Sequence, residues 1–297
     1  MQKFKFIKAG TKRNNSKHFF YVFLGLLILF STKAMAQGDL LIFPKRVVFE
    51  GSKRSQTFNL SNIGKDTARY NISYINMRMK EDGGFEKITE PDSGQFFAGP
   101  YIRFFPRRVV LAPKESQVVK VQLTKTNQLV EGEYRSHLYF SAAPVIKPLG
   151  EEEIQKEIQK DTTLITVRLI PVFGISLPNI IRRGESTTKL SLSNLSFEKF
   201  NDTIPIIKME FNRTGNMSVY GDIVVNYISP KGKKTEVGKI QGFAVYTPGV
   251  LRKCKIELKK PEGVDYSKGK LSVIYSTQPS AKNKKLAEAE FVLGNGK

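Results

Sequence analysis

Few residues in this sequence have the types and spacing that catalysis or metal binding requires. After residue 36 the chain has one histidine, His137, and the whole chain has one cysteine, Cys254. A serine or cysteine triad uses a histidine as its base, and structural zinc needs clusters of Cys and His. His137 lies in the strand-like RSHLYF, and Cys254 alternates with Ile256 and Leu258. We therefore expect structural roles for both residues, and no enzyme, metal or cofactor.

An arginine at the head of an apolar strand has clearer binding chemistry. In KRVVFEGSKRSQTFNLSN, residues 45–62, Arg46 precedes Val47, Val48 and Phe49. A polar turn with a glycine then leads to an alternating strand, which is the pattern of a hairpin. Arg46 could lie in water at the sheet edge and balance Glu50. It could equally be there to bind a ligand.

Alternation with a period of two dominates the elements around these residues. RYNISY, QVVKVQL and RSHLYF each place apolar side chains on one face, and turn sequences such as NIGKDT and LAPKES separate them. Seven further candidate strands follow Gly184 in about 110 residues, a density typical of immunoglobulin-like folds. The sequence predicts an all-β protein of two tandem immunoglobulin-like β-sandwiches. We expect the N-terminal sandwich over 37–178 and the C-terminal one over 179–297, with the boundary near 179–187.

Two adjacent segments break this rhythm. Residues 147–161, KPLGEEEIQKEIQKD, are charged and predict an exposed loop. The next stretch, TTLITVRLIPVFGISLPNIIRRGE, is the most apolar one after residue 36. Its Pro171, Gly174 and Pro178 favour an edge strand or a bulge over a regular central strand. A long apolar edge strand tends to aggregate unless something covers it.

The N-terminus has the pattern of a secretory signal peptide. Residues 1–36 hold seven basic residues and no acidic ones, and an apolar run extends from Phe19 to Phe30. This run is short for a membrane span, and Ala34 and Ala36 flank Met35 in an A-x-A cleavage pattern. We expect cleavage near Ala36/Gln37 and no stable membrane span afterwards; an uncleaved anchor is the alternative.

The net charge of +21 permits electrostatic binding of nucleic acid, but no recognition motif supports it, so we expect solvated lysines.

These motifs together resemble the PapD-like family of periplasmic pilus chaperones. The resemblance covers about 41–145 well and 162–183 loosely. It rests on the stretch 46–51, the strand 56–62, and the ordered residues Pro106, Leu111, Pro113, Ser116, Arg135, Ser136, Leu138 and Phe140.

The resemblance implies that the protein lends a strand to a pilin-like subunit that lacks one, which is β-augmentation. The donor strand would lie at about 163–173, with Ile165, Val167 and Leu169 facing the subunit. Arg46 would be one of two cations that anchor the subunit's C-terminal carboxylate. The family's second cation is a lysine near the end of the donor strand, and this chain has no lysine between Lys160 and Lys189.

Arg168 or Arg182 could replace that lysine, or Arg182 could form an interdomain salt bridge. SLPNIIRRG resembles a divergent branch of the family. The implied function is an ATP-independent periplasmic chaperone for pilus, fimbrial or surface-fibre subunits. An outer-membrane usher and a self-capping homodimer are further implied partners. The alternative is a non-catalytic structural, adhesion or secretion-scaffold protein of the cell envelope.

Overall fold

The structure is a computed structural model and describes residues 40–143, 172–201, 203–278 and 284–294. The predicted signal peptide and the charged loop at 147–161 lie outside these residues. So do Ile165, Val167, Arg168 and Leu169, and of the predicted donor strand only Val172 and Phe173 are described.

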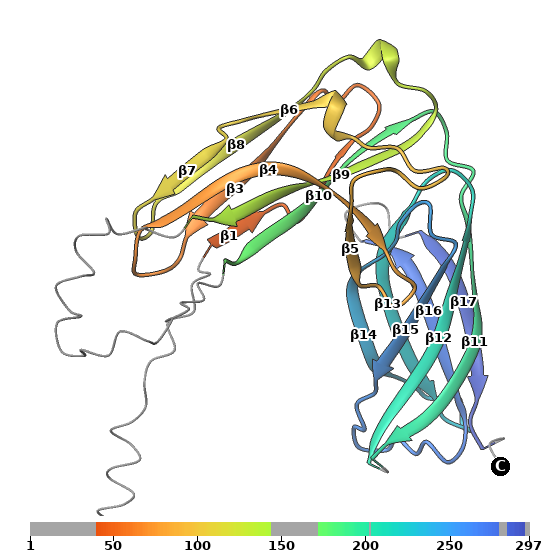
Figure 1. Ribbon diagram of the computed structural model, residues 1–297. Coiled ribbons are helices and arrows are strands. Elements are labelled where there is room, and N and C mark those ends of the chain that lie inside the picture. The colour runs from red at the N-terminus through yellow and green to blue at the C-terminus, as the bar shows by residue number, and fades with distance from the viewer. Residues whose placement is uncertain (1–39, 144–171, 202, 279–283, 295–297) are drawn as a thin grey trace, which may run out of the picture. The chain divides into compact units, whose positions relative to one another are not determined.

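The first sandwich packs two sheets face to face, and all their strand pairs are antiparallel except β2 with β10 (Figure 1). One sheet has the strand order β1-β3-β8-β6. It consists of β1 (Leu40–Phe43), β3 (Ser55–Asn62), β8 (Ser116–Leu123) and β6 (Ile102–Phe105). The other has the order β2-β10-β9-β4-β5, and β7 also pairs with β4. It consists of β2 (Val47–Phe49), β10 (Gly174–Arg183), β9 (Gly132–Ala142), β4 (Ala68–Met79), β5 (Phe85–Ile88) and β7 (Arg108–Leu111).

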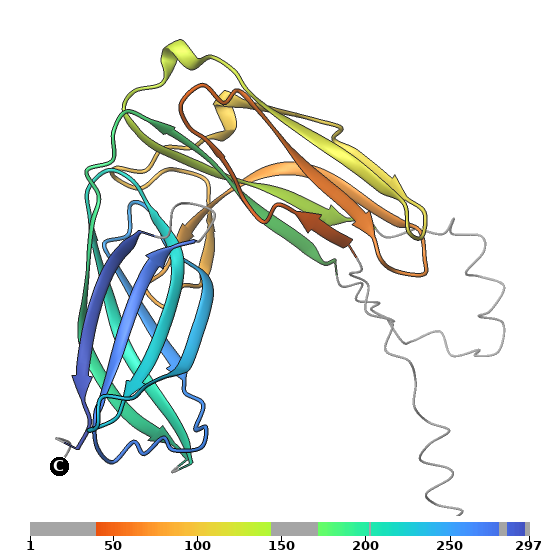
Figure 2. The ribbon, with the colours of Figure 1, turned by 180° about the vertical axis from the view of Figure 1, so that it is seen from behind.

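The second sandwich contains the seven strands predicted after Gly184, and its cyan to blue strands can be followed from behind in Figure 2. A three-stranded sheet, β11-β12-β15, faces a four-stranded sheet, β14-β13-β16-β17. The strands are β11 (Lys189–Phe200), β12 (Ile204–Thr214), β13 (Val219–Ile228), β14 (Lys234–Val245), β15 (Leu251–Glu257), β16 (Lys270–Thr277) and β17 (Lys285–Val292). The prediction of two β-sandwiches is confirmed.

Each sandwich has its own apolar core, built by the alternation seen in the sequence. Phe58 and Leu60 of β3 are fully buried between the sheets of the first sandwich, and Ile223 and Val225 of β13 in the second. Burying one such side chain stabilises the fold by about 1.5–3 kcal/mol. A third, small cluster joins Ile180 of β10 to residues of β14 and the segment after it, Ala244 and Tyr246.

Strand β10 carries the chain from the first sandwich toward the second. It pairs with β9 from Gly174 to Arg183, and with β2, in parallel, only at Asn179–Ile181. Pro178 therefore lies where one edge of β10 is still open, which fits its missing N–H. Because the β9 ladder continues to Arg183, we propose that the domain boundary falls at Gly184, within the predicted window. No helix among the described residues has the length and apolarity to cross a membrane.

Candidate functional site, two arginines over aromatic rings

Arg46 lies immediately before β2, and β2 belongs to the same sheet as β10. Its guanidinium carbon is 4.0 Å from the centroid of the Tyr220 ring, a cation–π contact with the second sandwich. The Nη1 atom is buried and has no hydrogen-bond partner among the described residues. Arg46 is partly buried, and it contacts the second sandwich as well as its own sheet edge. An unpaired buried N–H is costly, so this geometry favours a ligand that accepts a hydrogen bond.

Arg135 of β9 is a second cation at the same place, and sequence reasoning did not select it as an anchor. It is 3% exposed, and its guanidinium carbon lies 4.3 Å from the centroid of the Tyr246 ring. Its Nη2 donates to the carbonyl oxygen of Thr247 at 3.0 Å. Its Nε and Nη1 are buried and lack partners in the described part of the chain.

Electrostatics link these two arginines. Burial is the main cause that lowers the pKa of Arg135, and the charge of Arg46 lowers it further. Both arginines act on the Tyr246 hydroxyl, whose pKa burial raises. Arginine nevertheless stays protonated in proteins. The site therefore holds two positive charges with three unpaired buried N–H-bearing nitrogens, which a carboxylate would satisfy through charge-assisted hydrogen bonds.

His137 lies two residues further along the same face of β9. It is 2% exposed, and its ring packs edge-on against Phe85 at 5.5 Å between centroids. Burial, and then the charge of Arg135, lower its pKa from 6.5 to about 3. The neutral imidazole is thus a packing residue, as the sequence predicted, and not a third cation of the site.

This pKa shift predicts how stability depends on pH. The unfolded chain takes up a proton at His137 below about pH 6.5, whereas the folded chain does so only near pH 3. Stability from this residue is therefore present above pH 6.5 and is lost as the pH falls toward 3. We expect His137→Leu to remove about 3 kcal/mol of that pH dependence between pH 4 and 7. Urea unfolding at several pH values measures it; parallel curves for variant and wild type would contradict it.

Arg182 of β10 is engaged elsewhere. Its Nε lies 3.1 Å from the Glu133 carboxylate, whose side chain is fully buried, and its Nη2 donates to the carbonyl of Ser218 at 2.7 Å. The Ser218 amide at 3.1 Å and the Ser218 hydroxyl also donate to Glu133. Of the two roles that the sequence left open for Arg182, an interdomain contact fits this geometry better than a second carboxylate anchor; the ion pair itself, however, joins neighbouring strands of the first sandwich, and the hydrogen bonds with Ser218 are what reach the second. The role itself remains a proposal.

A third buried arginine, Arg213 of β12, has all its partners in the protein. It is 3% exposed and donates to the carbonyl oxygens of Gly215, Met217, Pro248 and Gly249. It thereby holds the segments next to Ser218 and Thr247. Arg213 shows what a structural buried arginine looks like here, and Arg46 and Arg135 differ from it by their unpaired nitrogens.

Other candidate chemistry is sparse in the described residues. Cys254 is half-buried on β15, and burial raises its pKa to about 11, so the thiol stays protonated. No group of three His, Cys, Asp or Glu side chains in the described ranges could hold a metal ion. A cavity of about 580 Å³ is lined by residues of the second sandwich and by Asp82, but neither Arg46 nor Arg135 lines it.

The start of β10 has one strand edge that no described strand covers. From Gly174 to Pro178 this strand pairs with β9 on one side, and β2 covers the other side only from Asn179 onward. The residues just before it, Val172 and Phe173, are 52% and 55% exposed. An open edge with apolar side chains is suited to pairing with another strand.

Comparisons with known proteins concern the fold. No family model matches the sequence, and no curated protein matches it. The fold is similar to that of several solved structures that are chaperones or complexes containing one.

The YadV chaperone is 11% identical, with 86% of this chain and 100% of that chain covered and a TM-score of 0.41. The CupB2 chaperone of Pseudomonas aeruginosa is 14% identical, with 86% and 100% covered and a TM-score of 0.39. The CsuC–CsuE chaperone–tip adhesion subunit complex of Acinetobacter baumannii matches at 10% identity, with 85% and 98% covered and a TM-score of 0.41. At these identities and scores the function has to follow from the residues of this chain.

Proposed function

We propose that the protein is a periplasmic, ATP-independent chaperone that binds pilus or surface-fibre subunits. Arg46 and Arg135 anchor the subunit's C-terminal carboxylate, and the chain upstream of β10 completes the subunit's sheet. Binding requires no catalysis and no cofactor. The observation that carries the proposal is a pair of neighbouring guanidinium groups that hold buried nitrogens without a hydrogen-bond partner among the described residues.

A carboxylate fits this pair better than other acceptors do. Two positive charges in a partly dehydrated site favour an anion, and the fork of each guanidinium matches the two oxygens of a carboxylate. Aromatic rings of Tyr220 and Tyr246 lie under the guanidinium groups and fix their planes. Because both cations are arginines, the protein's side of this contact keeps its charge at every pH at which the fold is stable.

Strand donation explains why the anchor lies beside an open edge. Arg46 precedes β2, and β2 ends its pairing with β10 at Asn179, so the open edge of β10 begins next to the anchor. A carboxylate held there sets the register of the added strand, since a slip of one residue would turn every side chain to the opposite face. The predicted donor residues Ile165, Val167 and Leu169 remain a proposal, as do an usher partner and self-capping by a homodimer.

Co-purification from the periplasm tests the function, with wild type beside Arg46→Ala. We expect a small β-sandwich subunit to co-purify with wild type and to be reduced at least tenfold with the variant, because one charged hydrogen bond contributes about 1.5–3 kcal/mol. The captured subunit is then re-expressed with two extra C-terminal residues, which move its carboxylate and should also abolish binding.

Two results would count against the proposal. Equal capture by wild type and Arg46→Ala would mean that Arg46 does not anchor the subunit. Absence of any subunit would favour the alternative, a structural or secretion-scaffold protein of the cell envelope.

A further inference from the structure

The turn between β4 and β5 binds the edge of the second sandwich. The amide of Lys253 on β15 donates to the carbonyl oxygen of Glu81 at 2.7 Å. The Lys253 ammonium group also lies 2.8 Å from the Glu81 carboxylate. Among the described strands β15 pairs with β12 alone, so the turn supplies a backbone partner for the open edge.

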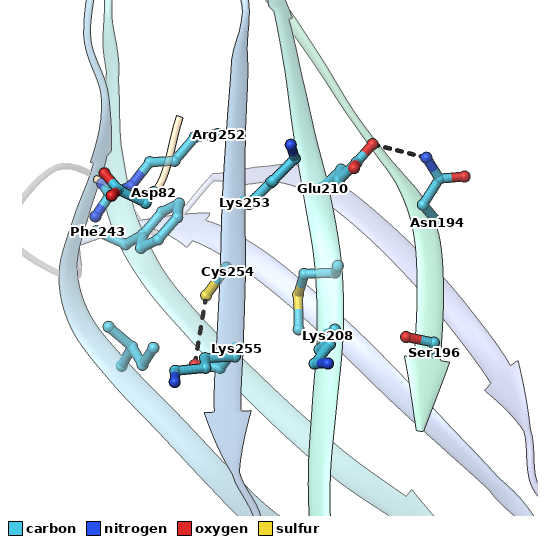
Figure 3. Close-up of a pocket in the computed structure, with 12 residues that line it drawn as sticks. Asp82, Asn194, Ser196, Lys208, Glu210, Phe243, Arg252, Lys253, Cys254 and Lys255 are labelled. Carbon is cyan, nitrogen blue, oxygen red and sulfur yellow. Dashed lines mark hydrogen bonds between the residues drawn. The ribbon is translucent and has the colours of Figure 1, made fainter. Parts of the chain in front are cut away.

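Arg252 makes this contact specific. Its guanidinium carbon lies 3.8 Å from the centroid of the Phe243 ring, and it donates to the carbonyl of Ala244. Gly83 covers the guanidinium with a φ of +86°, and a Cβ there would lie 2.6 Å from Nη2 of Arg252. Figure 3 shows Asp82 of the same turn beside Arg252 and Phe243, at one end of the 580 Å³ cavity. Glycine therefore suits the backbone conformation, and a Cβ at this position would displace the Arg252 guanidinium from its place on Phe243.

A continuous set of contacts leads from this turn to the arginine pair. Phe85, the first residue of β5, has its ring 6.2 Å from that of Tyr246. Tyr246 in turn lies under Arg135, and Arg135 donates to the neighbouring Thr247. The segment that carries Tyr246 and Thr247 therefore meets the β4–β5 hairpin on one side and Arg135 on the other.

We infer that residues 81–83, which we name the turn clasp, hold Tyr246 and Thr247 in place. These two residues in turn hold the Arg135 guanidinium in the orientation that binds a carboxylate. The part of this inference that concerns carboxylate binding rests on the proposed function. The part that concerns the structure of the unliganded protein does not. If the clasp merely protected the edge of β15 from aggregation, opening it would leave the arginine site unchanged.

The test compares Gly83→Ala with Gly94→Ala. Gly94 has a similar φ of +76° but no atom within 4 Å of an added Cβ, so it controls for backbone strain alone. The distance between the sandwiches is measured with spin labels at Thr57→Cys and Lys239→Cys, which are both exposed, in a Cys254→Ala background.

Carboxylate binding is measured with benzoate as the probe and benzamide as its neutral match. The ¹⁵Nε resonances of Arg46 and Arg135 report that binding.

We expect Gly83→Ala to broaden the distance distribution, shift the Arg135 resonance in the unliganded protein and weaken benzoate at least fivefold relative to Gly94→Ala. Glu81→Lys should act in the same direction, and adding Lys253→Glu should restore binding by recreating the ion pair with opposite signs. Identical distance distributions for the two glycine variants would overturn the inference, and so would a broadened distribution with unchanged benzoate affinity. If benzoate does not bind the wild-type protein, that result counts against the proposed function. The distance distributions and the Arg135 resonance of the unliganded protein would then still test the role of the turn clasp.

Discussion

Replacing Arg135 by methionine is expected to reduce affinity for the client subunit about 100-fold while leaving the melting temperature unchanged or higher. The loss of affinity follows because a charged hydrogen bond to a carboxylate in a dehydrated site contributes about 3 kcal/mol. The stability is retained because Arg135 is 3% exposed and leaves its Nε and Nη1 unpaired in the free protein. Methionine fills a similar volume without a buried charge.

Arg213→Met is the matched control for this variant. Arg213 is equally buried, but protein carbonyls accept from its guanidinium at four residues. Its removal should lower the free energy of unfolding by roughly 3–5 kcal/mol. Calorimetry and titration with the purified subunit measure both variants. A large loss of stability for Arg135→Met, without a loss of affinity, would make Arg135 a structural residue like Arg213.

The fold could be predicted from the sequence because its information is local. Alternating side chains and turn residues mark each strand, and the seven strands of the second sandwich follow those marks. Arg46 could be selected for the same reason, since it stands at the head of a marked strand. The sequence left open whether Arg46 is an edge residue or a ligand-binding residue. That choice depends on Tyr220, which lies far along the chain and approaches Arg46 only in the folded protein.

Arg135 and Glu133 were missed for one physical reason. In the sequence Arg135 alternates with the apolar residues of β9, which is how a solvent-facing residue of an antiparallel sheet looks. In the structure that face is covered, and β9 is buried continuously from Gly132 to Leu138. Glu133 lies on the same face of β9 as Arg135, two residues before it. The signal available in the sequence was the pair of opposite charges at Glu133 and Arg135, two residues apart and therefore on one face of the same strand.

The Glu133 network predicts how the two sandwiches depend on each other. Glu133 accepts from Arg182 of β10 and from Ser218, which begins the approach to β13 in the second sandwich. Removing one partner of a buried ion pair leaves the other without compensation, at a cost of about 3–5 kcal/mol. We expect Glu133→Ala to destabilise the protein by that amount and to separate its single unfolding transition into two, because the cores of the sandwiches are otherwise distinct.

Glu86→Ala provides the control, since Glu86 also pairs with an arginine but its side chain is 55% exposed. An exposed pair of this kind contributes about 0–1 kcal/mol, so this variant should unfold like wild type. A double-mutant cycle of Glu133→Ala and Ser218→Ala then isolates the hydrogen bond from the Ser218 hydroxyl to Glu133, which joins the two sandwiches, whereas Arg182 pairs with Glu133 within the first sandwich. We expect a coupling of at least 1 kcal/mol, within the range measured for residues in direct contact. Strict additivity, together with one unfolding transition in every variant, would mean that the network does not couple the sandwiches and that the apolar cluster of Ile180, Ala244 and Tyr246 is enough to do so.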